Sequence, residues 1–310
     1  MIVNPMDVLH QFPVRKSKKQ KQAFRDAVCS YAEGLGYPCI VEAGSSGSRN
    51  VVIGNPETAK YLITAHYDTC AGMPFPNIVT PTNLAAYLAY QISIVLAYLA
   101  VCGALGFGVY ALTSDREMSV LLALAVYYIL VFLMMFGPAN KHNANDNTSG
   151  VVTVLEIMKQ LPEMHCGNVC FILFDLEEAG LVGSKSYAKA HKSEIRNQLV
   201  LNMDCVGDGD EIVFLPGKKV RKNPEMLETL RAITGSWGEK SITLHEKGFA
   251  FYPSDQSSFP YGVAIGAFHR KNGVGLYYSR IHTNRDTILE EENVSILCRA
   301  LMHFITGTAQ

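Results

Sequence analysis

Two long apolar stretches in the first half of the chain restrict its fold more than any other feature. Residues 84–112 carry no charge over 29 positions, and residues 120–136 have no polar side chain over 17 positions beyond two tyrosine hydroxyls. A helix needs about 20 mostly apolar residues to cross the hydrocarbon core of a bilayer. The first stretch is long enough with some tilt, and the second is long enough once Met118 and Ser119 are added. The sequence therefore predicts a membrane-spanning helical hairpin that is interrupted at residues 113–117.

The alternative is a helical hairpin buried inside a soluble protein, or a dimerisation arm. A buried helix of this length without one charged residue would need a much larger domain around it.

Irregular backbone cannot face lipid, so an inserted membrane segment must be a pair of helices. Two crossings return the chain to the same side. We therefore expect one discontinuous domain from residues 1–80 and 138–310, with residues 81–137 as the inserted hairpin.

Outside the hairpin, expected strands alternate with expected helices. This alternation implies an α/β fold with a mainly parallel, mixed sheet and helices on both faces, a three-layer sandwich. The apolar run at residues 168–176 is typical of a strand buried on both faces. The other expected strands are residues 39–42, 50–54, 61–66, 199–203, 211–215 and 263–269, and the expected helices are residues 17–35, 149–161, 181–191, 224–234 and 294–306.

Charge and cysteine content narrow the partners and the compartment. The net charge of -1 leaves no basic surplus to neutralise phosphates, which argues against a nucleic-acid partner. The basic cluster at residues 15–21 is expected to be the solvated start of a helix or a contact with anionic lipid. None of the eight cysteines forms a Cys-x-x-Cys pair, and we expect buried free thiols in a reducing compartment. The first residues do not resemble a signal peptide.

These observations predict a cytoplasmic position for the domain. Lys141 and the basic cluster flank the expected crossings on the domain side, whereas residues 113–117 carry a single arginine beside Asp115 and Glu117. Positive residues favour the cytoplasmic side of a membrane. We therefore expect a protein of the cell membrane with two spans, a cytoplasmic domain, and residues 113–117 on the far side.

Candidate chemical groups follow several of the expected strands. His66 ends one apolar run, Glu177 and Glu178 end a second, and Asp204 ends a third. In open α/β sheets, ligands bind in the crevice beyond the carboxyl ends of the strands. Imidazole and carboxylate groups suit zinc, and two adjacent glutamates can supply a ligand and a free base. Asp68 is placed to accept a hydrogen bond from the His66 imidazole.

The order of these motifs resembles the co-catalytic zinc exopeptidases, which include bacterial leucyl aminopeptidases and glutamate carboxypeptidase II. The motifs are His-x-Asp at 66–68, Asn-Asp-Asn-x-Ser-Gly at 145–150, Glu-Glu-x-Gly at 177–180, Met-Asp at 203–204 and Ile-His-Thr at 281–283. The resemblance covers roughly residues 17–75 and 138–310. It does not cover the apolar hairpin, which stands where the family has a short loop.

The resemblance implies two zinc ions and assigns their ligands. Asp146 would bridge the two ions. His66 and Asp204 would complete one zinc site, and Glu178 and His282 would complete the other.

The resemblance also implies that Glu177 is the general base toward the attacking water and that Asp68 orients the imidazole. Two positions depart from the family pattern. Gln256 replaces a histidine in the Ser-Asp-His-x-x-Phe segment, which puts substrate contacts from that loop in doubt. Ile281 replaces a tyrosine, and whether a tyrosine at 277–278 takes over its contact is left open.

The function that the resemblance implies is that of a membrane-anchored zinc exopeptidase, most of all an aminopeptidase. Its expected partners are a peptide substrate and the lipid bilayer. The oligomeric state stays open. One alternative is a non-catalytic scaffold or chaperone on the same fold, against which the complete ligand set argues. Another is a different reaction at the same metals, such as amide deacylation or cyclisation of N-terminal glutamine. A transporter is a third, although two spans do not easily form one without oligomerising.

Overall fold

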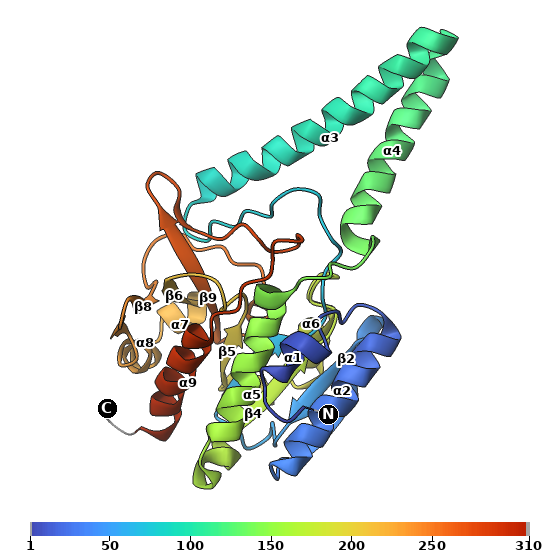
Figure 1. The fold of residues 1–310 in the computed structure, drawn as a ribbon. Helices are drawn as coiled ribbons and strands as arrows, with labels where there is room; N and C mark the ends of the chain where they lie inside the picture. The colour runs from blue at the N-terminus through green and yellow to red at the C-terminus, as the bar shows by residue number, and fades with distance from the viewer. Residues whose placement is uncertain (1, 308–310) are drawn as a thin grey trace.

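The protein is built around a ten-stranded mixed sheet, seen in a computed structural model that describes residues 2–307 (Figure 1). The strands lie in the order β1-β2-β4-β3-β5-β9-β6-β8-β7, and β10 pairs with β9. Their bounds are β1 Cys39–Ala43, β2 Arg49–Ile53, β3 Tyr61–His66, β4 Val169–Phe174, β5 Leu199–Met203, β6 Glu211–Pro216, β7 Gly235–Trp237, β8 Lys240–Leu244, β9 Gly262–Lys271 and β10 Gly275–Tyr277.

The centre of the sheet is parallel, and this places the carboxyl ends of its strands together. β3 pairs in parallel with β4 and β5, and β5 pairs in parallel with β9. Every residue of β3, β4 and β5 is buried. In the register of β3 and β4, His66 lies opposite Phe174. The segments that follow β3, β4 and β5 therefore emerge at one edge of the sheet.

Helices cover both faces of the sheet, as the alternating pattern predicted. Apolar side chains of α2, α5 and α9 pack with one face of the strands in the main core, and α6 packs on the other face. The bounds of the helices in the domain are α1 Asp7–Gln11, α2 Lys18–Gly34, α5 Gly150–Gln160, α6 Val182–Ala190, α7 Lys218–Arg221, α8 Pro224–Arg231 and α9 Glu291–Thr306. The mainly parallel α/β sandwich is confirmed, with β7, β8, β10, α1 and α7 as elements that the pattern did not predict.

The basic cluster at residues 15–21 is not simply a solvated charge run. Ser17 and Gln20 form a capping box at the start of α2, in agreement with a helix beginning there. Arg15 is 0% exposed, and buried Lys21 pairs with Asp175 at 2.6 Å. Two of the cluster's cations therefore belong to the interior of the domain, because buried carboxylate and carbonyl oxygens accept their hydrogen bonds.

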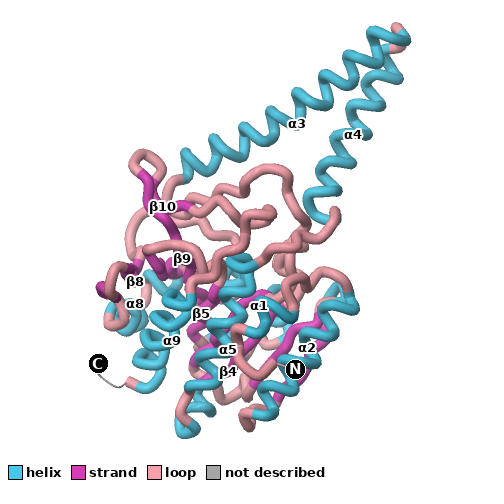
Figure 2. The backbone as a smooth tube through the Cα atoms, in the orientation of Figure 1, coloured by secondary structure: helices cyan, strands magenta, loops and turns pink. Residues whose placement is uncertain are grey.

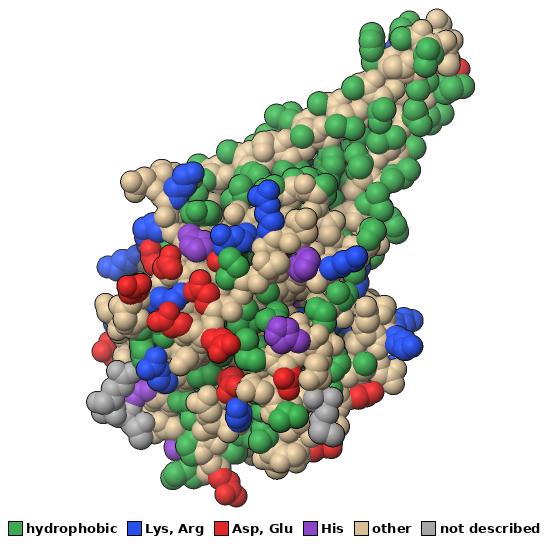
Figure 3. Space-filling view, viewed as in Figure 1, with side chains coloured by type: hydrophobic (Ala, Val, Ile, Leu, Met, Phe, Trp, Pro, Cys, Tyr) green, Lys and Arg blue, Asp and Glu red, His purple; other side chains and the backbone are tan. Residues whose placement is uncertain are grey.

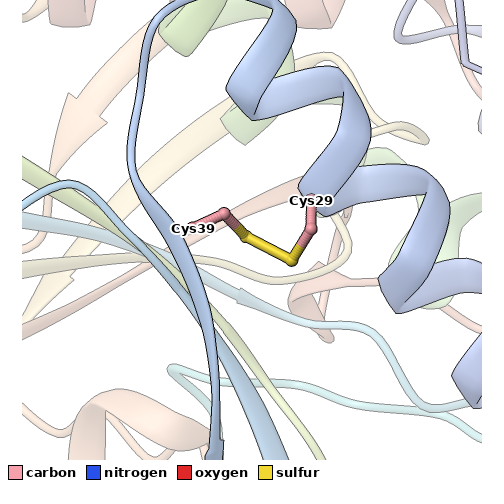
Figure 4. The surroundings of a disulfide bond; sticks show 2 residues. All are labelled: Cys29 and Cys39. Atoms are coloured by element: carbon pink, nitrogen blue, oxygen red, sulfur yellow. A yellow bond between two sulfur atoms is a disulfide. The ribbon is translucent and has the colours of Figure 1, made fainter.

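The prediction that all eight cysteines are free thiols is wrong for two of them. Cys29 on α2 and Cys39 at the start of β1 form a disulfide (Figure 4), with their Cα atoms 5.4 Å apart. The two residues are only ten positions apart, and the turn after α2 brings the strand back against the helix. The other six cysteines are free. Sequence spacing missed this pair because the contact depends on how α2 packs on β1.

The two apolar stretches form two long helices that project from the domain (Figure 2). α3 spans Leu84–Thr113 and α4 spans Arg116–Phe136, with Asn83 and Asp115 as their N-caps. α4 starts four residues earlier than the apolar run, because Asp115 accepts a hydrogen bond from the Met118 amide. By length and composition both helices could cross a membrane.

The hairpin is the least buried part of the described chain. The most apolar 18-residue windows of α3 and α4 are 11% and 6% buried. Figure 3 shows hydrophobic side chains covering the projecting hairpin, with the charged side chains gathered on the domain below it. At the closed end of the hairpin, Gly106 lets α3 approach α4, since a Cβ at this position would lie 3.1 Å from the Ser119 carbonyl oxygen.

Candidate metal centre

Asp146 lies between two histidines, each of which faces a different oxygen of its carboxylate. His66 Nε2 is 3.2 Å from Asp146 Oδ1, and His282 Nε2 is 3.0 Å from Asp146 Oδ2. The three side chains come from three different segments, at the end of β3, before α5 and before α9. A carboxylate that offers one oxygen to each of two ligand sets is the arrangement that a bridging ligand needs.

The other candidate ligands join Asp146 in two clusters. His66, Asp146 and Asp204 have ligand atoms within 4.8 Å of one another, and so do Cys70, Glu178 and His282. The distance from His66 Nε2 to Asp204 Oδ1 is 3.8 Å, and from His282 Nε2 to Glu178 Oε2 it is 3.3 Å. All five side chains that the sequence proposed as ligands therefore come together.

Cys70 is a member of the second cluster that the sequence reasoning missed. Its side chain is buried, and its thiol lies 3.6 Å from the Asn143 side-chain oxygen. The available signal was its position four residues after His66, in the loop that leaves the carboxyl end of β3. A thiol in that loop can turn back toward the same crevice as the imidazole.

The loop around Asp146 is fixed by the residues on either side of it. The Asn145 and Asp146 amides donate to the two carboxylate oxygens of Asp286, at 2.7 and 3.0 Å. The Asn147 side chain donates to the Met203 carbonyl and accepts from the Gly150 amide. Backbone amides of the Asn-Asp-Asn motif therefore join this loop to the segment after His282, and the Asn147 side chain joins it to the end of β5.

Asp68 has a different set of contacts from the expected one. Its carboxylate accepts hydrogen bonds from the amides of Glu177 and Glu178, at 3.0 and 3.2 Å. The nearest partner of His66 Nδ1 is the backbone carbonyl of Asp68 at 3.1 Å, whereas the carboxylate Oδ1 is 3.7 Å away. Asp68 therefore orients the imidazole through its backbone and holds the glutamate pair through its side chain.

Three residues at the centre have left-handed backbone conformations without being glycine. Leu176 before Glu177, Cys205 after Asp204, and His282 itself have φ angles of 57°, 56° and 59°. Such conformations are costly for residues with a Cβ and persist where the surrounding structure enforces them. Here each one lies at or beside a candidate ligand or base. The surrounding structure therefore enforces unusual backbone conformations at this site.

Three of the titratable groups of the centre, Glu177, Glu178 and His282, hold protons more tightly than usual, whereas Asp146 holds its proton less tightly. Burial raises the pKa of Glu177 well above its ordinary value and that of Glu178 to about 7. Burial disfavours the charged form of His282, but the carboxylates of Glu178 and Asp146 raise its pKa to about 9. For Asp146, hydrogen bonds with both imidazoles outweigh burial and lower the pKa. In the absence of a cation, protons therefore compensate this group of carboxylates.

Arg15 places a fixed positive charge behind the centre. Its Nε donates to the Tyr67 carbonyl at 2.5 Å, and its Nη1 donates to the Thr148 hydroxyl at 3.1 Å. Tyr67 and Thr148 are neighbours in sequence of Asp68 and Asp146. Burial lowers the pKa of Arg15 to about 10, so its guanidinium stays charged at neutral pH.

The donor set fits divalent cations, and zinc in particular. Four carboxylates and two imidazoles meet at this edge of the sheet, and the buried Oε1 of Glu178 has no hydrogen-bond partner. Buried carboxylates are costly unless they are paired or bind a metal. Histidine nitrogen and carboxylate oxygen are the usual ligands of catalytic zinc sites. The metal would compensate the excess negative charge that protons compensate in its absence.

A cavity of about 180 Å³ opens in front of these ligands. Beyond the ligands it is lined by Asn77, Val79, Tyr87, Cys205, Tyr252, Pro253, Tyr278 and Ile281. Tyr278 therefore lines the cavity, and its hydroxyl donates to the Tyr252 hydroxyl at 3.0 Å. Gln256 is not among the lining residues and bonds to the Tyr252 carbonyl and to Asn202 instead. Nothing in the sequence marked Tyr87, since it lies in the first turn of the apolar hairpin.

Comparisons with known proteins show which fold and family the chain resembles. The structure is similar to Porphyromonas gingivalis glutaminyl cyclase, with a TM-score of 0.58 and 15% identity over 96% of this chain and 94% of that one. It is equally similar to the LapA aminopeptidase of Legionella pneumophila, with a TM-score of 0.58 and 14% identity over 97% of this chain and 70% of that one. At these identities the likeness shows the fold.

A search of the curated proteins found no match. The model of peptidase family M28 matches residues 131–299, which is more than half of the chain and includes Asp146, Glu177, Glu178, Asp204 and His282. The match supports zinc-dependent peptidase chemistry. Its extent, together with the shared fold, shows that the chain belongs to peptidase family M28.

Proposed function

We propose that this protein is a membrane-anchored aminopeptidase that uses two zinc ions. The observation that carries the proposal is the position of Asp146, whose two carboxylate oxygens face His66 and His282 at 3.2 and 3.0 Å. One zinc would be held by His66, Asp146 and Asp204, and the other by Asp146, Glu178 and His282. When bound, such ions polarise a peptide carbonyl and activate water for attack.

Glu177 is the general base in this proposal. It is adjacent to the proposed ligand Glu178, lines the same cavity, and has no part in the two ligand clusters. The Glu177 backbone amide donates a hydrogen bond to the Asp68 carboxylate, and this bond holds the backbone at Glu177 in place. A proton that Glu177 accepts from water can then pass to the leaving amine.

The lining of the cavity favours the amino end of a peptide. Its charged members are carboxylates and imidazoles, and no lysine or arginine lies among the lining residues of this pocket. A carboxypeptidase needs a cation or a comparable donor group for the terminal carboxylate of its substrate. A free α-amino group meets no competing lysine or arginine side chain among these lining residues. The cavity therefore supports an aminopeptidase over a carboxypeptidase.

Glutamine cyclisation is a second candidate, favoured by the similarity to a glutaminyl cyclase. Both reactions need a polarised carbonyl and a general base, but their products differ. Hydrolysis of a glutaminyl peptide releases glutamine, whereas cyclisation leaves a pyroglutamyl peptide and releases ammonia. A single glutaminyl substrate therefore separates them.

The test is a substrate screen on detergent-purified, zinc-loaded protein. We expect hydrolysis of aminoacyl anilides with a free amine, and no hydrolysis of their N-acetylated forms or release of C-terminal residues. Glu177→Gln is the matched control for contaminating peptidases. Release of acetate from the N-acetylated substrates would make the protein a deacylase, and ammonia release from a glutaminyl substrate with formation of the pyroglutamyl product would make it a cyclase. Bound zinc without any turnover would favour the scaffold function.

The membrane anchor is the hairpin formed by α3 and α4. We propose that residues 1–80 and 138–310 form the catalytic domain and that residues 81–137 are an insertion that crosses the bilayer twice. The supporting observations are the low burial of both helices and their apolar surface on the face that Figure 3 shows. If the hairpin projected into water, its apolar side chains would form an exposed patch much larger than those that soluble proteins usually carry.

We propose a cytoplasmic position for the catalytic domain, on the strength of six free cysteines and of Lys141, which follows the hairpin on the domain side. The Cys29–Cys39 disulfide opposes it, because disulfides persist mainly in oxidising compartments. A cysteine introduced by Ser114→Cys, on the far loop, should react with an impermeant maleimide in intact cells, whereas the parent protein should not. Labelling of the variant only after lysis would overturn this orientation.

A further inference from the structure

The segment that leads into the hairpin covers the candidate metal centre. The Met73 amide donates to the carbonyl of His282 at 2.7 Å. Further along, Val79 and Tyr278 exchange two backbone hydrogen bonds at 3.1 and 3.2 Å, as in a short antiparallel bridge. Since His282 is a proposed ligand and Tyr278 lines the cavity, this segment is held directly against the site.

The first turn of α3 is fixed to the domain in the same way. The Asn83 side chain accepts from the Ala86 amide at 3.0 Å, which caps the helix, and donates to the Val274 carbonyl at 3.0 Å. The Phe251 amide donates to the Pro81 carbonyl at 2.8 Å. The start of α3 is thus held by two loops of the domain. The position of this helix end is set by the domain and not only by lipid.

Tyr87 is the residue through which α3 reaches the cavity. It lies one turn after the cap, and it lines the cavity together with Asn77 and Val79. Its ring lies against that of Phe251, with 5.6 Å between the ring centroids. Phe251 is therefore a support that limits how far the tyrosine can move away from the cavity. A side chain of the apolar hairpin forms part of the substrate-facing wall.

The cavity is small and, away from the ligands, mostly apolar. Its volume of about 180 Å³ is below the ~300–1,000 Å³ of ordinary ligand pockets. Val79, Tyr87 and Ile281 bound it beyond the carboxylates and imidazoles. Such a space suits the first residue of a peptide when that residue has a small apolar side chain. Tyr87 is the largest of these three wall residues.

The lengths of the two helices place this wall at the level of the lipid headgroups. α3 has 30 residues and α4 has 21, so α3 is longer by about 14 Å at 1.5 Å per residue. About 20 residues suffice to cross the hydrocarbon core, and the first turns of α3 thus extend below it. Tyr87 and Tyr90 lie in these turns, where tyrosine is enriched at membrane interfaces. Phe249 and Phe251 are exposed on the adjacent loop.

We propose that Tyr87 is a specificity-determining residue, by which the first membrane helix limits the site to peptides with a small apolar first residue taken up at the bilayer surface. This inference rests on the proposed aminopeptidase function and names its substrate class. It makes the hairpin part of the substrate pocket as well as an anchor.

The test compares Tyr87→Ala with Tyr87→Phe and with Leu88→Ala, an exposed neighbour on the same helix. Alanyl, leucyl and phenylalanyl anilides are the substrates. We expect the parent to prefer alanyl substrate, and Tyr87→Ala to raise kcat/KM for the phenylalanyl relative to the alanyl substrate at least about tenfold, the scale at which an apolar pocket discriminates size. Tyr87→Phe and Leu88→Ala should keep the parent's preference. An unchanged ratio in Tyr87→Ala overturns the inference.

A binding experiment separates this inference from the proposed function. Alanyl and phenylalanyl hydroxamates, which chelate zinc, are titrated calorimetrically into zinc-loaded Glu177→Gln protein with and without Tyr87→Ala. We expect the alanyl compound to bind more tightly when Tyr87 is present, and the difference to shrink about tenfold without it. This result supports the inference even if the parent hydrolyses no peptide. Equal binding of both compounds to the protein with Tyr87 overturns it whatever the activity.

Discussion

The sheet edge and the hairpin contain apolar runs of similar character in opposite surroundings. β3, β4 and β5 are apolar and wholly buried, and Asp68, Asp175 and Asp204, which follow them, are buried as well. α3 and α4 are also apolar but have few buried residues, and on the face in view their charged residues are few (Figure 3). The domain thus buries its apolar residues away from water, whereas the hairpin leaves its apolar residues largely unburied.

The difference shows what each region needs from its environment. In the domain, helices on both faces of the sheet remove the strands from water, and this burial strengthens the electrostatic interactions among His66, Asp146 and Glu178. The hairpin has no such cover within the described residues, and in the proposed function lipid tails take its place. The two regions meet at Tyr87, where the exposed helix enters the polar site.

The largest expected effect concerns the buried side of this comparison. Glu177→Gln keeps the size of the side chain but removes the proton acceptor. We expect activity to fall by at least ~10²–10⁴-fold, which is typical for loss of a positioned base, while zinc content stays at the parent level. The measurements are kcat with an alanyl anilide and metal analysis of the same sample. Loss of zinc together with activity would make Glu177 a ligand.

The second effect tests whether the exposed region is separable. Residues 94–132 are replaced with a flexible linker of about 20 residues, which spans roughly 25 Å on average, and the first turns of α3 with Tyr87 remain. We expect a protein that is soluble without detergent and retains the zinc content and size preference of the parent. Size-exclusion chromatography and metal analysis provide the readout. Aggregation with loss of zinc would show that the domain depends on the whole hairpin.

A smaller effect concerns the protons that the site holds without metal. Folding raises the pKa of His282 to about 9, of Glu178 to about 7 and of Asp286 to about 8, above unfolded values near ~6.5 and ~4. Raised values mean that the folded state binds protons more tightly, so this stability is present at low pH and is lost as pH rises through about 7–9.

The melting temperature of metal-free protein should therefore fall between pH 6 and pH 9, on the order of 5 °C. Zinc replaces these protons, so the stabilisation that it brings should be larger at pH 9 than at pH 6. Thermal melts at both pH values, with chelator or with zinc, provide the measurement. A metal-free protein that is more stable at pH 9 would contradict the charge balance described for the centre.

The parts of the structure that follow from local pattern were predicted well. β3 and β5 occur at the expected residues, and the proposed ligands His66, Glu178 and Asp204 meet because parallel strands bring their carboxyl ends to one edge. The parts that depend on packing were not predicted. Cys29 finds Cys39 only through the angle between α2 and β1, and Cys70 reaches the centre only through the course of its loop.

Contacts between distant segments explain the remaining differences. The burial of Arg15 depends on acceptors at Tyr67 and Thr148, which lie 52 and 133 positions away. No local charge pattern separates such an arginine from a solvated one. In the sequence, Tyr87 likewise does not differ from the other residues of an apolar helix. Its role depends on the fold, which brings the loop with Phe251 against it.

The central claim is that Asp146 joins two metal sites into one centre, and zinc stoichiometry tests it most directly. We compare the parent, Asp146→Ala and Glu57→Ala, a control that removes an exposed carboxylate in the turn before β3, at the opposite end of that strand from His66. The parent and the control should hold two zinc ions per chain after dialysis. Asp146→Ala should lose both, because two close cations repel each other without a shared anion. Two ions retained by Asp146→Ala, or only one held by the parent, would contradict the account.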